Sequence, residues 1–164
     1  MFHARALLTT LVAHQVEFVV IGGMAMVSHG SSHVTRDLDI CYDRSDENID
    51  RLARALSPLQ PSLRDAPPAL PFVWDAKTIE AGFNFTLDTS AGPLDLIAEV
   101  PGVGLFEDVR KQANLLEVYK SDIRVLNLEA LIESKRAAAR PKDAAHLLEL
   151  EELRRLRDEE QSDG

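Results

Sequence analysis

The fold of this chain is decided by residues 18–42, which read FVVIGGMAMVSHGSSHVTRDLDICY. The first four residues form a continuous apolar run that ends at Gly22 and Gly23, a pattern typical of a buried strand closed by a tight turn. Residues 24–29 then have the spacing of a short helix. The last six residues, 37–42, alternate between polar and apolar side chains, as a half-buried strand does. The stretch therefore predicts a strand, a tight turn, a short helix and a second strand.

Two acids in the second strand belong to one face of the predicted sheet. Because strand side chains alternate, Asp37 and Asp39 point to one side while Leu38 and Ile40 point to the other. The two Cα atoms would lie about 6.6 to 6.8 Å apart at the usual strand rise, so both carboxylates could reach metal ions spaced about 3.5 to 4 Å apart. This spacing predicts a metal site.

A third acid stands in a similar apolar strand. Asp95 lies between Leu94 and Leu96, and an aspartate there is costly to bury unless it is paired or bound to a metal. We predict that Asp95 joins Asp37 and Asp39.

The glycine turn offers an anion site beside these acids. A strand that ends in Gly22 and Gly23 before a helix exposes backbone N–H groups and the positive end of that helix to a phosphate. Taken alone, the pair is better explained as a tight strand-to-helix turn; together with the acids it favours phosphate binding.

Periodicity and turn residues predict the other elements. We expect helices over residues 4–14 and 46–56, the second capped by Asp46. We expect strands over 83–87 and 94–98, joined by residues 88–93, and a strand pair near 115–119 and 123–126. From Asn127 onward the pattern is helical, and Pro141 can open a new helix at its first position.

Residues Ser57 to Pro71 contain five of the eight prolines and show no periodicity. They predict a surface loop without regular structure. A loop of this length in a compact domain is often functional, so it is either a plain loop or a lid over the site.

Composition limits the class of protein. The chain has 164 residues, 45% hydrophobic and 27% charged, values of an ordinary globular domain. We expect one α/β (α+β) domain, in which residues 1–126 form a small mixed sheet with flanking helices and residues 127–164 a C-terminal helical pair. The single cysteine, Cys41, cannot form an internal disulfide. With no apolar run near the roughly 18 residues of a membrane helix, these features predict a cytoplasmic protein without a membrane partner.

The motifs resemble the polymerase-beta-like nucleotidyltransferase superfamily. The resemblance rests on Val20 to Gly23, thirteen intervening residues, Asp37 to Ile40, and the distant Leu94 to Leu96. Within this superfamily, the sequence around these motifs is most similar to small bacterial proteins related to AbiEii-type toxins. The stretch from Leu126 to Asp143 is similar to the C-terminal helices of those proteins.

This resemblance implies transfer of a nucleoside monophosphate from a nucleoside triphosphate to an acceptor hydroxyl. It implies two Mg²⁺ ions, with Mn²⁺ as an alternative, bound by Asp37, Asp39 and Asp95. It also implies that the triphosphate lies against Gly22 and Gly23, and that Asp95 completes the metal site at the attacking hydroxyl. A transfer RNA or a small molecule as acceptor, and a cognate antitoxin as partner, are compatible with it.

Basic residues late in the chain are candidates for triphosphate binding. Lys135, which the resemblance places near the active site, and Lys142 could reach the triphosphate, as could Arg136 and Arg140. A solvated helical face explains the same pattern. Arg36, directly before Asp37, is a further nucleotide-binding candidate.

Two histidines and one alternative function complete the predictions. We interpret His29 as packing at a helix end and His33 as an exposed loop residue.

The net charge of −9 argues against broad attraction to a nucleic-acid backbone. The alternative to an enzyme is a non-catalytic nucleotide-binding protein or a toxin–antitoxin partner.

Overall fold

The computed structural model describes residues 1–67 and 69–163. Pro68, inside the predicted loop, and Gly164, the end of the predicted extension, lie outside the described residues. The helices are α1 (Ala4–Ala13), α2 (Gly22–Ser28), α3 (Asp46–Leu56), the 3-10 turn η1 (Ser57–Leu59), α4 (Ala76–Ala81), α5 (Phe106–Lys111), α6 (Leu128–Ala138) and α7 (Asp143–Ser162). The strands are β1 (Phe18–Ile21), β2 (Leu38–Tyr42), β3 (Ser62–Leu63), β4 (Phe85–Thr89), β5 (Gly92–Ile97), β6 (Glu99–Val100), β7 (Gly104–Leu105), β8 (Ala113–Val118) and β9 (Ser121–Leu126).

A mixed sheet forms the centre of the molecule, as the sequence predicts. In the described residues, seven strands follow the order β3-β4-β5-β2-β1-β9-β8, and β6 pairs with β7 apart from them. β2 is parallel to β5 and antiparallel to β1, while β1 is parallel to β9. The two strands predicted to carry the acids are therefore direct neighbours in the sheet.

Apolar spacing builds the core. Ile49, Leu52 and Leu56 recur along α3 at helical intervals and are 0–1% exposed. They belong to one continuous cluster with the buried residues of α1 and with Leu38 and Ile40 of β2. This packing fixes the strands and, with them, the polar side chains on the opposite side of β2.

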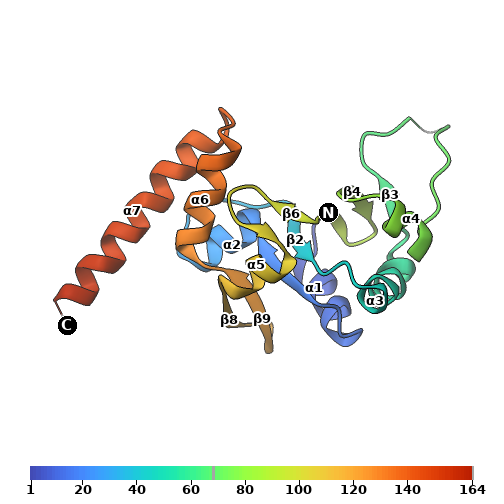
Figure 1. Ribbon diagram of the computed structural model, residues 1–164, viewed down its shortest axis with the longest axis horizontal. Helices are drawn as coiled ribbons and strands as arrows, with labels where there is room; N and C mark the ends of the chain where they lie inside the picture. Colours follow the sequence, from blue (N-terminus) through green and yellow to red (C-terminus); the bar gives the residue numbers. More distant parts are fainter. Residues whose placement is uncertain (68, 164) are drawn as a thin grey trace.

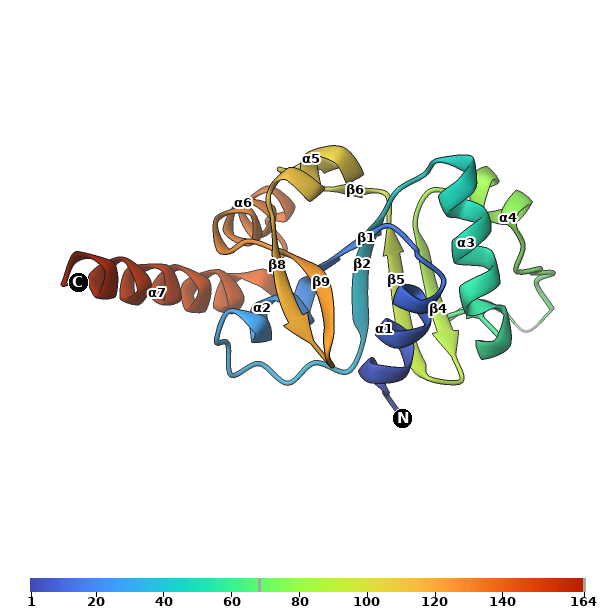
Figure 2. The same ribbon diagram turned by 90° about the horizontal axis from the view of Figure 1, so that it is seen from below.

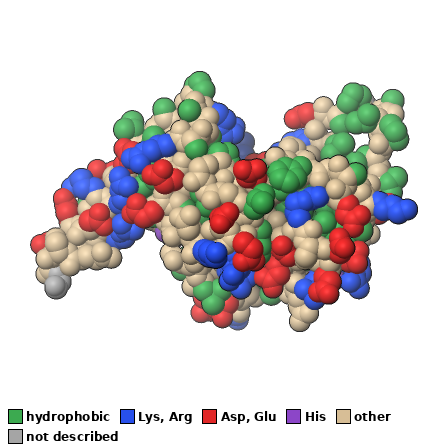
Figure 3. Space-filling view, viewed as in Figure 1, with side chains coloured by type: hydrophobic (Ala, Val, Ile, Leu, Met, Phe, Trp, Pro, Cys, Tyr) green, Lys and Arg blue, Asp and Glu red, His purple; other side chains and the backbone are tan. Residues whose placement is uncertain are grey.

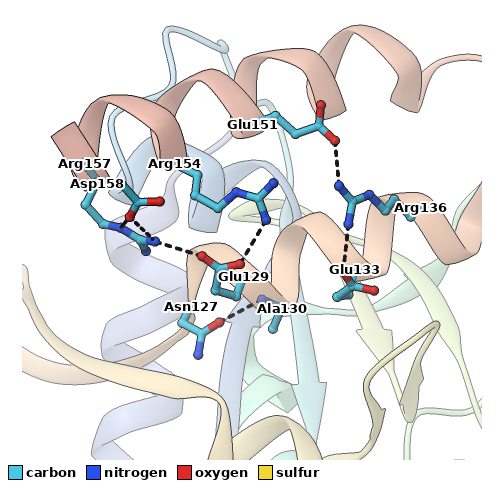
Figure 4. Close-up of polar contacts among 9 residues, drawn as sticks. All are labelled: Asn127, Glu129, Ala130, Glu133, Arg136, Glu151, Arg154, Arg157 and Asp158. Carbon is cyan, nitrogen blue, oxygen red and sulfur yellow. Dashed lines mark hydrogen bonds and ion pairs between the residues drawn. The ribbon is translucent and has the colours of Figure 1, made fainter.

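The C-terminal helices lie at one end of the molecule. Both ribbon views show α7 extending outward, with α6 between it and the sheet and the segment after β3 at the opposite end (Figures 1 and 2). Ion pairs fasten α7 to α6: Glu129 accepts from Arg154 at 3.1 Å and from Arg157 at 2.8 Å, and Arg136 donates to Glu151 at 2.9 Å (Figure 4). The middle of α7 is thereby held against α6.

Several sequence predictions of local structure need correction. The stretch Ser57–Pro71 contains η1 and β3, and β3 pairs with β4. The connection predicted over residues 88–93 is a two-residue turn, because β4 and β5 stay paired up to Thr89 and Gly92. The side chain that caps α3 is Ser45, which accepts from the Asn48 N–H, and not Asp46. Pro141 does not open α7, whose first residue is Asp143.

The chain also forms elements that the sequence patterns do not predict. These are α4, α5 and the β6–β7 pair, each of two to six residues. They are too short to show a clear period. No helix of the described residues is long and apolar enough to cross a membrane.

Candidate active site

Three carboxylates meet on adjacent strands. Asp39 of β2 and Asp95 of β5 are register partners, and Asp37 directly precedes β2. Leu38 and Ile40, which alternate with the acids, are fully buried on the other side. One carboxylate oxygen of each acid lies within 4.8 Å of the others. Alternation and parallel pairing thus bring together the three acids that the sequence singles out.

The glycine turn lies against one of these acids. Ile21 is paired with Asp39, so the next residue, Gly22, passes beside the carboxylate. Gly22 has a φ of +65°, and a Cβ added there would lie 2.0 Å from Asp39 Oδ2. Only glycine combines this backbone conformation with such a close approach. α2 begins at Gly22 rather than at Met24, so both glycines belong to its first turn.

A threonine connects the second glycine to Asp37. The Thr35 hydroxyl donates to the Asp37 backbone carbonyl at 2.9 Å and lies 3.4 Å from Asp37 Oδ1. A Cβ added to Gly23 would lie 2.8 Å from the same hydroxyl. Thr35 therefore restrains Asp37 and fills the space left by Gly23.

The protein compensates the charge of the cluster only in part. Burial, followed by the charges of Asp37 and Asp95, raises the pKa of Asp39 to about 7. Lys135 acts in the opposite direction but does not outweigh them. Hard carboxylate oxygens at this spacing fit one or two Mg²⁺ or Mn²⁺ ions, whose charge would relieve the repulsion.

The acids open into a cavity of about 590 Å³. Its lining combines the glycine turn, the acids, the β5–β6 region and the facing sides of α6 and α7. The lining includes Gly22, Gly23, His33, Asp37, Asp39, Asn84, Asp95, Glu99, Lys135, Arg140, Lys142, Asp143 and His146. Another hollow, of about 400 Å³, lies near Glu17 and Arg124 and contains none of these acids. The chemistry of the first cavity makes it the candidate site.

A buried acid holds two cations on the far wall. Asp143 is 2% exposed; it accepts from Lys135 Nζ at 3.0 Å and from Arg140 Nε at 2.7 Å. Burial would raise the pKa of Asp143, but the hydrogen bonds from Arg140 and Lys135 outweigh it and lower the pKa to about 2. Asp143 thus remains ionised and fixes the lysine at the cavity wall.

The other predicted residues are distributed as follows. Lys142 lines the cavity with its exposed side chain, whereas Arg36 is exposed and is absent from the cavity lining. Arg136 points to Glu133 and Glu151 instead. His29 packs at the end of α2, where Nε2 lies 2.8 Å from the Leu126 carbonyl, as predicted.

The prediction for His33 is wrong. His33 is half-buried and lines the cavity, where its ring packs edge-on against His146 with centroids 4.8 Å apart. The partner ring comes from α7, more than a hundred residues later in the chain. A sequence pattern confined to residues 30–36 carries no sign of this contact.

One residue in contact with the acids was not predicted. Arg64, which follows β3, places Nη2 2.9 Å from Asp95 Oδ1. It lies in the proline-rich stretch where the sequence shows no period, so nothing local marks its position.

The chain has the nucleotidyltransferase fold. It is similar to TM1012 of Thermotoga maritima, a protein assigned provisionally as a nucleotidyltransferase, with TM-score 0.52, 17% identity, and coverage of 94% of this chain and 90% of that one. It is also similar to the antibiotic-resistance factor ANT(2'')-Ia in solution, with TM-score 0.55, 14% identity, and coverage of 96% and 89%.

A crystal structure of ANT(2'')-Ia in complex with adenylyl-2''-tobramycin matches as well, with TM-score 0.54, 14% identity, and coverage of 90% of this chain and 83% of that chain. Comparison of the sequence with protein-family models and with curated proteins gives no match. At these identities the likeness establishes the shared fold.

Proposed function

We propose that this chain transfers a nucleoside monophosphate from a nucleoside triphosphate to the hydroxyl of an acceptor. The observation that carries the proposal is the convergence of Asp37, Asp39 and Asp95 within 4.8 Å, directly beside the turn at Gly22. Phosphoryl and nucleotidyl transfer depend mainly on positioning and charge neutralisation, which such a cluster on rigid strands supports.

The cavity supplies a role for each residue. Gly22 and Gly23 would lie against the triphosphate, and Lys135 and Lys142 would contact it from the opposite wall. The acids would hold two Mg²⁺ ions, or Mn²⁺, which neutralise the triphosphate and lower the pKa of the attacking hydroxyl. We do not extend the proposal to Arg36, because it lies outside the cavity lining.

The transfer itself is a single displacement. The acceptor oxygen forms a bond to the α-phosphorus, the bond from that phosphorus to the bridging oxygen breaks, and pyrophosphate leaves. Asp95 would orient the acceptor hydroxyl, whose proton passes to this carboxylate or to water.

Charge favours a small, amine-bearing alcohol as the acceptor. Glu99 lines the cavity in addition to the three acids proposed to hold metal ions, and the net charge of the chain is −9. On the face seen in Figure 3, basic and acidic side chains of the described residues are interspersed. A transfer RNA, which the toxin-like motifs suggest, is a polyanion that binds best to a continuous basic surface. The complex of ANT(2'')-Ia with adenylyl-2''-tobramycin gives the first acceptor class to test.

The test is transfer of radiolabel from each α-labelled nucleoside triphosphate, with Mg²⁺, to aminoglycosides, to total transfer RNA and to protein. Asp37→Asn should lower the rate about 100- to 1000-fold, the scale of losing an electrostatic contact to a transition state. Asp122→Asn, an exposed acid of β9 outside this cavity, is the matched control and should keep the rate.

The outcomes separate the alternatives. Label on an aminoglycoside that depends on Asp37 supports the proposal in full, and label on RNA or protein keeps the chemistry but changes the acceptor. If no acceptor is labelled and calorimetry still detects Mg²⁺-dependent binding of nucleotide, the chain is a non-catalytic nucleotide-binding protein. If neither is seen, a toxin–antitoxin partner role replaces the enzyme.

A further inference from the structure

We infer that Arg64 is a positioning residue that fixes the carboxylate of Asp95 for the reaction. This inference rests on the proposed function for its kinetic consequences, but its structural core does not. Arg64 comes from the edge of the sheet, two strands away from Asp95, and belongs to a segment that carries none of the acids.

The path of Arg64 is defined by several contacts on β4. Its backbone N–H donates to the Thr86 carbonyl at 2.9 Å, and Thr86 is the register partner of Asp95. Its guanidinium then donates through Nη2 to the Leu87 carbonyl at 2.6 Å and through Nε to Asp88 at 3.2 Å. The side chain therefore crosses β4 at the level of Asp95 and has little freedom to move.

The Arg64 guanidinium also contacts one carboxylate oxygen of Asp95. Nη2 lies 2.9 Å from Oδ1, an atom without solvent exposure that has no well-aligned hydrogen-bond donor among the described residues. Arg64 is the only cation of the described residues paired with Asp95. The ion pair occupies this oxygen and restrains rotation of the carboxylate, while the acid remains close to Asp37 and Asp39.

Position matters more than charge in this contact. A reacting group must be held within about 0.5 Å of its productive place, and it is held there by residues that do not themselves react. The guanidinium contacts three oxygens at once, two through hydrogen bonds and that of Asp95 through the ion pair, which the single ammonium group of a lysine cannot do. The side chains of Arg64 and Asp95 are 21% and 23% exposed, whereas that of Asp88 is 53% exposed, so the contact with Asp95 is the shielded half of the network.

The alternative is that Arg64 only fastens β3 to the sheet. Asp88→Asn tests this alternative, because it removes the ion pair with the exposed partner and leaves the contact with Asp95 in place. If Arg64 served only as a fastener, Asp88→Asn and Arg64→Gln would have similar effects. If it positions Asp95, the two variants differ.

The experiment compares wild type, Arg64→Gln, Arg64→Lys and Asp88→Asn in steady-state kinetics with Mg²⁺ and the acceptor found above. We expect Arg64→Gln to lower kcat about 10- to 100-fold, as loss of a supporting contact around a metal site typically does. KM for the nucleoside triphosphate should change less than about twofold, because its proposed contacts are elsewhere. Arg64→Lys should recover part of kcat, and Asp88→Asn should stay within about twofold of wild type.

Crystal structures of wild type and Arg64→Gln give a readout without catalysis. The inference requires that the Asp95 carboxylate leaves its position or occupies two rotamers in the variant. An unchanged Asp95 together with unchanged kcat would overturn it, as would equal losses in Arg64→Gln and Asp88→Asn. If wild type itself transfers nothing, the proposed function fails, and the crystal structures still decide whether Arg64 positions Asp95.

Discussion

At Gly22, the main chain and a proposed metal ligand lie closer together than any side chain allows. Gly22→Ala should lower the free energy of unfolding by about 1–2 kcal/mol through its left-handed backbone, and should also displace Asp39, since the new Cβ would lie 2.0 Å from Oδ2. We expect loss of Mn²⁺ binding in calorimetry together with lower stability in urea.

Gly30→Ala is the control for this prediction. Gly30 also has a positive φ, +104°, but a Cβ there would meet nothing closer than Leu153 at 3.6 Å. The Gly30→Ala protein should lose a similar amount of stability and still bind Mn²⁺. Equal Mn²⁺ affinity in the two variants would show that the close approach at Gly22 has no bearing on the metal site.

Asp39 should make the stability of the metal-free protein depend on pH. Its pKa is about 7 in the folded protein against 3.8 as the ordinary value, so the folded state binds a proton more tightly than the unfolded state. Proton binding to Asp39 therefore stabilises the folded state. This stabilisation is complete below the unfolded pKa and is lost as pH rises through 7. With EDTA present, the melting temperature should therefore increase as pH falls from 8.5 to 6.5.

Asp39→Asn should remove most of this pH dependence. His146, whose pKa is lowered mainly by burial, acts in the opposite direction near the lower end of this range, and Asp39→Asn leaves that contribution in place; the pKa of Asp143 is far below the range. With Mg²⁺ added, the stabilisation by the ion should grow with pH, because metal and proton compete for the same carboxylate. Identical melting curves for wild type and Asp39→Asn across the range would contradict this reading of the cluster.

At the scale of elements, the sequence predicts what depends on near neighbours. Alternation around Leu38 and Leu94 predicts the bounds of β2 and β5 to within a few residues. The same alternation assigns the acids to one face of the sheet. The helical spacing of Ile49, Leu52 and Leu56 gives α3 its full length. These signals are local, and the core that they build is continuous.

Other contacts depend on pairing between distant segments, which local patterns do not contain. β3 has two residues and exists because it pairs with β4, more than twenty residues later. Arg64 reaches Asp95, and His33 reaches His146, only through such pairing. The convergence of the three acids in the candidate site could therefore be predicted from the sequence, whereas the contacts of Arg64 and His33 could not.

At the scale of the whole molecule, the cavity lining contains both basic and acidic side chains. Lys135, Arg140 and Lys142 lie on the side of α6 and α7, and Glu99 and Asp95 lie on the side of β5 and β6. With the triphosphate and its metal ions bound, Asp95 would be neutralised and Lys135 and Lys142 would face phosphate, which leaves the exposed Glu99 available to an acceptor. A chain with net charge −9 adds a long-range attraction for cations.

This arrangement predicts a salt dependence that distinguishes acceptors. For an amine-bearing acceptor, kcat/KM should fall about tenfold between 20 and 500 mM salt, because screening weakens the attraction that raises its local concentration. A neutral sugar alcohol used as a matched acceptor should show little change. Glu99→Gln should reduce the slope for the cationic acceptor and leave the neutral one unaffected, since Glu99 is exposed at the cavity. If kcat/KM for the cationic acceptor rises with salt, the acceptor approaches Lys135 and Lys142 rather than Glu99.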